Sequence, residues 1–338
     1  MTKLSVLLVY GGQSSEHDVS IKSAHNVYAA LDDEKYDVYL CYIDRYGKWW
    51  LMSAIDSTHT GRPQLFPALG QKQFLVIPGN TSLRIDVVLP ILHGRFGEDG
   101  TVQGLCELLH LPYVGPSVLA AAVTMDKDMT KRLLQDADVP VVPWRAWKIR
   151  NHKPRYQDVV EELGEVVFVK PASAGSSVGV SKVSNAHDWE GVLDKASLHS
   201  EVVLIEKAIT AREIEVAVLG NDDPRVSGLG EIIPGDEFYS YNDKYSSAST
   251  SRTIVPAGID DEIAKQIHEY ALRAYQVTEC RGMARVDFFV DDNDSIYLNE
   301  INSIPGFTNI SMYPKLWQEM GVRYPELIDQ LISLALEK

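Results

Sequence analysis

The chain has 338 residues, of which 45% are hydrophobic and 23% charged, and acidic residues outnumber basic ones 47 to 32, for a formal net charge of −15. A chain of this length can form two or three domains with cores of their own. The acidic excess disfavours general nucleic-acid binding, because phosphate backbones are bound by basic surfaces, although a local basic pocket could still hold a small anion.

The cysteines and the hydropathy pattern indicate the compartment. Three cysteines lie far apart in the sequence, which favours neither a disulfide framework nor a zinc site and fits a reducing environment. No apolar run approaches the length of a membrane span. The first apolar run, 4–10, is short and no small-residue cleavage site follows it, so it predicts a strand and not a signal peptide. We therefore expect a cytoplasmic protein.

Residues 1–123 are predicted to form a parallel α/β domain. Strand, glycine-rich loop and helix alternate here, as in parallel sheets whose functional loops lie at the carboxyl ends of the strands. The stretch 49–79 shows no long periodic pattern and predicts no definite element. The expected elements are strands at 4–10, 37–43 and 86–92 and helices at 19–31 and 102–109.

Two further segments are predicted, 124–220 and 221–338. The first is expected to be a small α+β domain, because short β-rich runs alternate with helical patterns. The second contains an amphipathic helix with acidic residues in its first turn. The expected elements are helices at 124–136, 188–197, 260–275 and 324–336 and strands at 166–170, 178–183, 202–207 and 213–219.

A hairpin is predicted between residues 283 and 302. Two runs rich in β-branched and aromatic residues flank a cluster of turn formers, which is a hairpin signal. We expect a four-residue loop at 292–295, which fixes the register of the two strands. The resulting pairs are Asp291 with Ile296, Asp287 with Glu300, and Arg285 with Asn302.

This register would gather oxygen donors on one face of the sheet. Side chains two residues apart share a face of a strand, so Asp287, Glu300 and Asn302 would converge with Arg285 beside them. Carboxylate and amide oxygens suit Mg2+. Opposed like charges destabilise a sheet, so a cation is expected nearby. The alternatives are an acidic turn with a stray ion pair, or Ca2+ at the loop, although EF-hand spacing is missing.

Three loops carry further candidate chemistry. Lys170 opens a loop rich in glycine and serine that could present N–H groups and hydroxyls to phosphate, although it lacks P-loop spacing and could be a plain hairpin turn. Glu16 lies before the first helix, where it suits a ligand ammonium group, although this loop could simply cap the helix. The polar stretch 236–252 could close over a site or form a surface loop.

Two more features complete the set of candidates. Glu206, Lys207 and Glu213 lie on neighbouring strand segments, where they could read an adenine edge and ribose hydroxyls or simply be surface charges. The segment 303–311 is irregular and rich in backbone donors, and Gly306 would let a ligand approach closely.

Taken together, these motifs resemble the ATP-grasp enzymes, and specifically the D-alanine–D-alanine ligase family. The resemblance covers nearly the whole chain, and the motifs follow the order of the family. They are His93-Gly-Arg-Phe-Gly-Glu-Asp-Gly-Thr, Met125-Asp-Lys, Lys170-Pro with Gly175-Ser-Ser-Val-Gly, Lys244-Tyr245, Arg285-Val-Asp287, and Asn299-Glu-Ile-Asn-Ser-Ile-Pro-Gly-Phe-Thr.

The resemblance implies a three-domain ATP-grasp fold, with ATP bound between the second and third domains. It implies two Mg2+ ions, with Mn2+ as an alternative, and D-alanine and ATP as substrates. The residues implied for phosphates are Lys127, Lys170, Ser176, Ser177 and Lys244; for adenosine Glu206, Lys207 and Glu213; and for metal Asp287, Glu300 and Asn302.

The resemblance also implies how the amino acids are held. Glu16 would bind the ammonium group of the first D-alanine, supported through hydrogen bonds by Ser176 and Tyr245, with His93 near this substrate. The second D-alanine's carboxylate and the γ-phosphate would meet Lys244 and Ser311. The groups implied to stabilise the tetrahedral oxyanion are the Arg285 side chain and the Gly306 N–H.

The implied reaction makes D-alanyl-D-alanine for peptidoglycan precursors. ATP converts a carboxylate into an acyl phosphate, and a second amine then displaces the phosphate. Tyr245 favours this dipeptide over a D-Ala–D-lactate ester, whereas D-serine at the second site is harder to exclude. Another ATP-grasp carboxylate–amine ligase and a non-catalytic nucleotide- or metal-binding module are the alternatives. A homodimer without nucleic-acid or membrane partners is expected.

Overall fold

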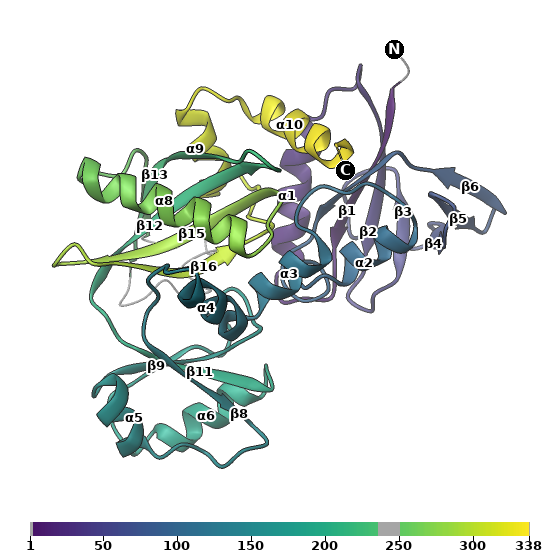
Figure 1. Cartoon of the computed structure of the whole chain (residues 1–338). Helices are drawn as coiled ribbons and strands as arrows, with labels where there is room; N and C mark the ends of the chain where they lie inside the picture. The colour runs from purple at the N-terminus through teal and green to yellow at the C-terminus, as the bar shows by residue number, and fades with distance from the viewer. Residues whose placement is uncertain (1–2, 236–250, 338) are drawn as a thin grey trace.

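The computed structural model describes residues 3–235 and 251–337, which form three sheets with helices packed around them (Figure 1). The three sheets have seven, four and five strands in chain order. Within these described ranges, no helix is long and apolar enough to cross a membrane.

The N-terminal sheet is mixed and not purely parallel. Its order is β6-β5-β4-β3-β2-β1-β7, and only β2, β1 and β7 are parallel neighbours. The antiparallel strands β3 to β5 come from the stretch 49–79, for which the sequence predicted no element, and β6 follows directly after it. The elements are β1 (Leu4–Gly11), α1 (His17–Ala30), β2 (Tyr36–Ile43), β3 (Trp49–Met52), β4 (Gln64–Ala68), β5 (Gln73–Ile77), β6 (Thr81–Arg84), β7 (Val87–Ile91), α2 (Thr101–Leu108) and α3 (Val118–Met125).

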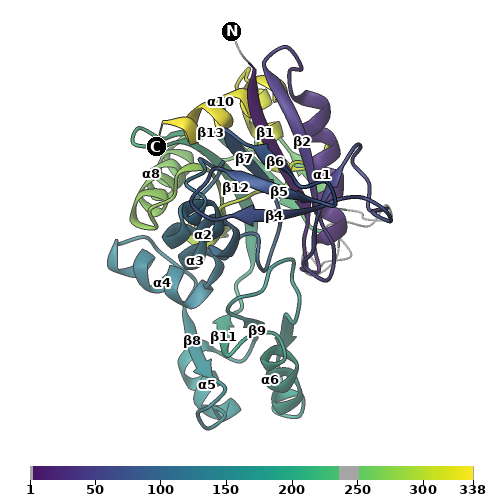
Figure 2. The same cartoon turned by 90° about the vertical axis from the view of Figure 1, so that its right-hand side faces the viewer.

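The central part is a small antiparallel sheet, β10-β9-β11-β8, with its own core. Figure 2 shows it standing apart from the rest of the molecule. The predicted helix over 124–136 is interrupted at Asp126, whose side chain accepts hydrogen bonds from the next helix's first turn. The elements are α4 (Lys127–Asp136), β8 (Trp144–Lys148), α5 (Tyr156–Leu163), β9 (Val167–Pro171), β10 (Ser181–Val183), α6 (Trp189–Ser197) and β11 (Val202–Lys207).

The C-terminal sheet has the order β14-β13-β12-β15-β16 and is antiparallel throughout. Sheet membership changes between β11 and β12, whereas the division expected from the sequence, at 220, falls at the last residue of β12. The elements are β12 (Ala211–Gly220), β13 (Arg225–Ile233), β14 (Arg252–Ile254), α8 (Asp261–Val277), β15 (Gly282–Asp291), β16 (Ile296–Asn302), α9 (Met312–Glu319) and α10 (Tyr324–Leu336).

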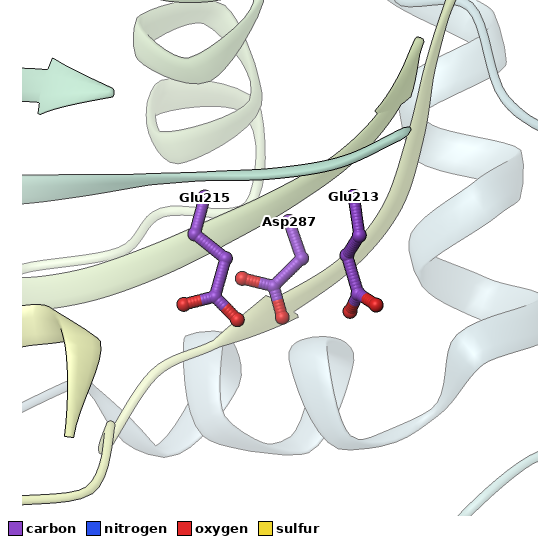
Figure 3. A group of neighbouring side chains, drawn as sticks. All are labelled: Glu213, Glu215 and Asp287. Atoms are coloured by element: carbon purple, nitrogen blue, oxygen red, sulfur yellow. The ribbon is translucent and has the colours of Figure 1, made fainter. Parts of the chain in front are cut away.

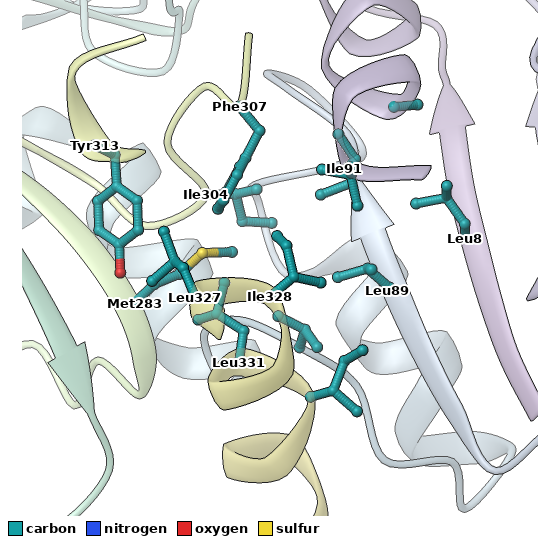
Figure 4. Packing of buried hydrophobic residues seen from close by; sticks show 14 of the residues in the cluster. Leu8, Leu89, Ile91, Met283, Ile304, Phe307, Tyr313, Leu327, Ile328 and Leu331 are labelled. Atoms are coloured by element: carbon teal, nitrogen blue, oxygen red, sulfur yellow. The ribbon is translucent and has the colours of Figure 1, made fainter. Parts of the chain in front are cut away.

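One hydrophobic core joins the N-terminal and C-terminal parts. It packs side chains of β1 and β7 against those of α10, β15 and the loop after β16, including Leu89, Leu327 and Phe307 (Figure 4). Burial of this many apolar side chains holds the two parts together. The loops that follow β1, β7 and β16 are therefore held close to one another.

Candidate active site

Two adjoining cavities bring most of the predicted residues together. The Glu16 cavity lies between the N-terminal loops and the C-terminal sheet, and the Lys170 cavity lies between the central and C-terminal sheets. Lys127, Ser176 and Glu300 line both. The other predicted residues lining the Glu16 cavity are Glu16, His93, Arg285, Asn302, Gly306 and Ser311, and those lining the Lys170 cavity are Lys170, Ser177, Glu206, Lys207 and Glu213.

Three predicted residues are not among these cavity linings. Asp287 is buried, at 1% exposed, and among the described residues it is the one predicted member that lines neither cavity. Lys244 and Tyr245 lie outside the described residues. The predictions for 236–250 therefore stay predictions.

The hairpin that begins at β15 has the predicted register at its functional end. Asp287 faces Glu300 and Arg285 faces Asn302 across the two antiparallel strands. The sequence prediction of these two pairs is confirmed. Their side chains therefore share one face of the C-terminal sheet.

The predicted register at the hairpin tip is wrong by one residue. Val290, and not Asp291, pairs with Ile296, which would turn the functional pairs to opposite faces in a regular hairpin. A register shift between Asp287 and Phe288 restores the alignment, since Phe288 pairs with Leu298. An extra residue in one strand of a ladder is a β-bulge. The one-residue shift at the tip and the bulge therefore cancel, and Asp287 still pairs with Glu300.

The row of acids extends to a third strand. Glu215 on β12 pairs with Asp287, so Glu215, Asp287 and Glu300 form a row of directly opposed carboxylates. The cation expected to offset them is Arg285, whose Nε and Nη2 donate to the two Asp287 oxygens at 2.7 Å each. Its Nε also lies 3.1 Å from Glu215 Oε2. We name Glu215, Arg285 and Asp287 the arginine cluster.

The charges of this cluster stabilise one another. Burial alone would lower the pKa of Arg285, but the charges of Asp287 and Glu215 outweigh it and hold that pKa well above its ordinary value. Arg285 therefore stays charged at any pH at which the protein is folded. With two acids and one arginine, the arginine cluster has a net charge of −1 when both acids are ionised.

The end of the hairpin that carries Asp287, Glu300 and Asn302 also fits a divalent cation. Lys127 Nζ lies 3.6 Å from Glu300 Oε2 and donates to Ala174 O at 2.9 Å, while Asn302 Nδ2 donates to Asp287 Oδ2 at 2.9 Å. Three carboxylates in the row face two cations, so negative charge remains in excess. Carboxylate and amide oxygens are ligands that Mg2+ prefers. The residues present therefore fit Mg2+.

Glu16 lies at the meeting point of three loops. It precedes α1, it is 8% exposed, and the Ser176 hydroxyl donates to its Oε1, as predicted. A Cβ added at Gly94 or Gly175 would lie 2.8 Å or 3.0 Å from Glu16 Oε2, so both glycines let backbone approach the carboxylate. Glu16 is therefore fixed by the loop after β7 and by the loop that Lys170 begins.

His93 and Ser311 both line this cavity, and His93 Nε2 lies 3.3 Å from Ser23 Oγ. Burial lowers the pKa of His93, although the Glu16 charge acts against this, so the imidazole is mainly neutral. Ser311 Oγ accepts a hydrogen bond from the Thr308 N–H at 3.0 Å. A Cβ at Gly306 would lie 2.8 Å from Ser311 Oγ. The 303–311 segment therefore presents backbone and a hydroxyl close together.

A second buried cluster borders the Lys170 cavity. Lys170 Nζ lies 2.8 Å from Glu206 Oε2, and Lys131 Nζ lies 3.0 Å from Glu206 Oε1. Burial would raise the pKa of Glu206, but the charges of Lys131 and Lys170 reverse this and hold it below its ordinary value. We name these three residues the lysine cluster. Its net charge is +1 when all three are ionised.

Sequence reasoning missed three residues of the site. Lys131 follows Lys127 by four positions, and this spacing on one helix was a usable signal for a second lysine on the same side. Glu215 follows Glu213 by two positions and so shares its face of β12. Glu98 lines the Glu16 cavity, and its Oε2 accepts from the Gly94 N–H at 2.5 Å.

The arrangement defines a class of protein before any comparison is made. A small antiparallel sheet and a larger one enclose a cavity with buried lysines, and the row of carboxylates adjoins it. This is the ATP-grasp arrangement, in which two sheets hold a nucleotide between them. Family profiles described as D-ala D-ala ligase N-terminus and D-ala D-ala ligase C-terminus match residues 5–116 and 133–333. The chain belongs to the D-alanine–D-alanine ligase family.

Individual relatives agree with this assignment. The chain is 46% identical over 352 residues to a D-alanine–D-alanine ligase from Proteus mirabilis, covering 100% of this chain and 96% of the relative. It is 44% identical to D-alanine–D-alanine ligase A from Escherichia coli K12, covering 100% and 97%. The chain is therefore an ATP-dependent ligase.

Solved structures show the same fold. The D-alanine–D-alanine ligase from Coxiella burnetii has a TM-score of 0.90 at 38% identity, covering 100% of this chain and 95% of that chain. The VanG D-Ala:D-Ser ligase from Enterococcus faecalis also has a TM-score of 0.90, at 33% identity, covering 99% and 100%. The fold alone therefore does not distinguish the second amino acid.

Proposed function

We propose that this ligase joins two D-alanines into D-alanyl-D-alanine through an acyl phosphate, for peptidoglycan precursor synthesis. The observation that carries the proposal is the Ser176–Glu16 hydrogen bond at the junction of the two cavities. This contact supports the proposal, because a carboxylate that could bind an ammonium group lies beside a loop that could bind phosphates. An amino acid held by Glu16 would then have its own carboxylate directed toward the nucleotide.

ATP is proposed to bind in the Lys170 cavity. Lys127, Lys170, Ser176 and Ser177 would hold its phosphates, because lysines and loop hydroxyls donate to phosphate oxygens. The adenosine would contact the residues farther along this cavity. These are Glu206, Lys207 and Glu213.

Asp287, Glu300 and Asn302 are proposed to hold two Mg2+ ions. Mg2+ supplies charge neutralisation between the anionic phosphates and the attacking carboxylate. Lys127, which contacts Glu300 in the resting state, is placed to assist on the phosphate side. Burial of the row of acids keeps the local dielectric low, so each charge there acts strongly.

The amino acids are proposed to react in the Glu16 cavity. Glu16 would hold the first ammonium group, with His93 beside this substrate, and Ser311 would meet the second carboxylate. Arg285 and the Gly306 N–H would stabilise the oxyanion that forms when the second amine attacks. The roles proposed for Lys244 and Tyr245 at the γ-phosphate, the second carboxylate and Glu16 concern residues outside the described ranges.

D-serine as the second substrate is the alternative, but the structural likeness to a D-Ala:D-Ser ligase does not favour it, because a D-alanine–D-alanine ligase has the same TM-score of 0.90. The closer sequence likeness is to D-alanine–D-alanine ligases, at 44–46% identity. ADP release and product mass measured with D-alanine alone, and with D-serine or D-lactate added, test the proposal. D-alanyl-D-alanine is the expected product, and a mixed product as the main species would contradict it.

The variant Glu300→Gln tests the proposed metal ligands separately. This change removes a charged ligand and preserves the shape of the side chain, so ligation should be abolished while the thermal unfolding temperature changes little. Turnover close to that of the wild type would contradict the metal assignment. Glu326→Gln makes the same chemical change on α10, outside both cavities, and serves as the matched control.

We further propose that the protein is a cytoplasmic homodimer. Size-exclusion chromatography with light scattering would give the mass directly, and a single species near 37.7 kDa would contradict the dimer.

A further inference from the structure

Glu215 is a buried acid for which the proposed reaction has no role. It is 2% exposed and lines the Glu16 cavity. Figure 3 shows its carboxylate projecting to the same side of the sheet as those of Glu213 and Asp287. One carboxylate oxygen from each of the three lies within 4.8 Å of the others. Burying a carboxylate is unfavourable unless a partner compensates it.

This group of acids is better described as a cradle for an arginine than as a metal site. The Arg285 guanidinium already lies against Glu215 and is hydrogen-bonded to both oxygens of Asp287. A cation among the same oxygens would lie next to a positive charge. Arg285 is therefore a compensating partner of Glu215.

The contacts of Arg285 conflict with its proposed task. Its guanidinium takes up both oxygens of Asp287, which lines neither cavity, although Asp287 is a proposed metal ligand. A metal ion bound by Asp287 would compete with Arg285 for the negative charge of those oxygens and so weaken its hydrogen bonds to them. Arg285 must then find another anion, since a buried guanidinium without a partner would be strongly destabilised.

We propose that Glu215 is a positioning residue. Its carboxylate accepts the Arg285 guanidinium when Asp287 turns to the metal. This inference rests on the roles proposed above for Arg285 and Asp287. The exchange needs only a small movement, because Arg285 Nε is already 3.1 Å from Glu215 Oε2. In the loaded state Arg285 and Glu215 form a neutral pair, and the guanidinium remains at the wall of the Glu16 cavity, where the oxyanion forms.

The exchange has a thermodynamic consequence for metal binding. Without Glu215, the release of Asp287 would leave Arg285 unpaired, so Arg285 would compete with the metal for Asp287. Glu215→Gln should weaken Mn2+ binding to the enzyme–ADP complex roughly tenfold, the size of one lost charge-assisted hydrogen bond. Electron paramagnetic resonance measures free Mn2+ in this complex without any turnover. Glu326→Gln, the same change on α10, should bind Mn2+ like the wild type.

A double-mutant cycle separates an effect through Arg285 from a direct effect on the metal. If Glu215 acts through Arg285, then adding Glu215→Gln to Arg285→Gln should change Mn2+ affinity by less than twofold. If Glu215 is itself a metal ligand, or acts only by its charge, the roughly tenfold loss should persist in the double variant. That second result, or wild-type Mn2+ affinity in the single variant, overturns the proposal.

Two further measurements complete the test. Glu215→Gln should lower kcat roughly tenfold or more while the KM of the first D-alanine changes little, because Glu16 is untouched. If this variant does not fold, Glu215→Asp replaces it in the double-mutant cycle. Aspartate keeps the negative charge, but its shorter side chain holds the carboxylate farther from Arg285. Ligation by the wild type reports on the proposed function separately, since Mn2+ binding with ADP requires no D-alanine.

Discussion

The lysine cluster and the arginine cluster solve the same electrostatic problem with opposite signs. In the lysine cluster two lysines share Glu206, and in the arginine cluster two acids share Arg285. Both are largely buried, so a lone charge in either would be strongly destabilised. Each cluster nevertheless keeps one charge in excess, positive beside the Lys170 cavity and negative beside the Glu16 cavity.

The difference in sign matches the ligand proposed for each cluster, a phosphate for the lysine cluster and a divalent cation for the arginine cluster. Phosphate oxygens would draw Lys170 from Glu206 and leave a neutral pair of Lys131 and Glu206. A divalent cation would draw Asp287 from Arg285 and leave a neutral pair of Arg285 and Glu215. Without ligands, Glu206 and Arg285 each compensate two opposite charges. With ligands bound, Lys131 would still compensate Glu206, and Glu215 would still compensate Arg285.

Removing the central cation of the arginine cluster should have the largest effect. Arg285→Met leaves Glu215 and Asp287 opposed and without their guanidinium, and it removes the proposed oxyanion partner. We expect ligation to fall roughly 1000-fold and the free energy of unfolding to fall by about 3–5 kcal/mol. ADP release with D-alanine and urea unfolding measure the two effects. A loss of stability with full activity would contradict the oxyanion role.

The lysine cluster should respond more mildly to the loss of Lys131, the lysine that lines neither cavity. Lys131→Met makes Lys170 the partner of Glu206 in that cluster, so Glu206 should hold Lys170 away from the phosphates more strongly. We expect the KM for ATP to rise roughly tenfold, equivalent to about 1.4 kcal/mol, with a smaller change in kcat. Lys131→Arg, which keeps the charge, is the matched control. An unchanged KM for ATP would show that the two lysines do not share Glu206 in this way.

The sequence predicted the pairs at the functional end of the hairpin but not the clusters built on them. Alternation along a strand places Arg285 and Asp287 on one face, and this local rule needs no further information. That Glu215 joins them depends on β12 pairing with β15, a contact between segments about 70 residues apart. The bulge beside Asp287 was equally unpredictable, since no residue in β16 marks it.

Glu98 differs from the acids of both clusters, because the nearby charge of Lys127 does not offset the effect of its burial on its pKa. Burial, and then the charge of Glu16, raises its pKa to about 8 from an ordinary 4.5, although Lys127 acts in the opposite direction. The unfolded chain loses this proton near pH 4.5 and the folded chain only near pH 8. Stability from this group is therefore present below pH 4.5 and is lost as the pH rises to about 8.

Glu98→Gln should remove this pH dependence. Glutamine stays neutral, so the variant should gain stability relative to the wild type between pH 5 and pH 8, by roughly 1–3 kcal/mol at the upper end. Thermal unfolding at several pH values, without ligands, measures the difference. A variant whose difference from the wild type is the same at pH 5 and pH 8 would show that Glu98 titrates normally.

An exposed ion pair outside both clusters should show the smallest effect and so tests whether burial is the deciding variable. Lys35 Nζ donates to Asp329 Oδ2 at 2.6 Å and ties the loop before β2 to α10, yet both side chains are partly exposed. Water screens such a pair, and an asparagine at this position could still accept the hydrogen bond from the Tyr36 hydroxyl, so Asp329→Asn should lower the free energy of unfolding far less than Arg285→Met does. Urea unfolding at low and high salt measures this, and ligation should be unchanged. A loss as large as that in Arg285→Met would mean that charge pairing, and not burial, sets the energies of the two clusters.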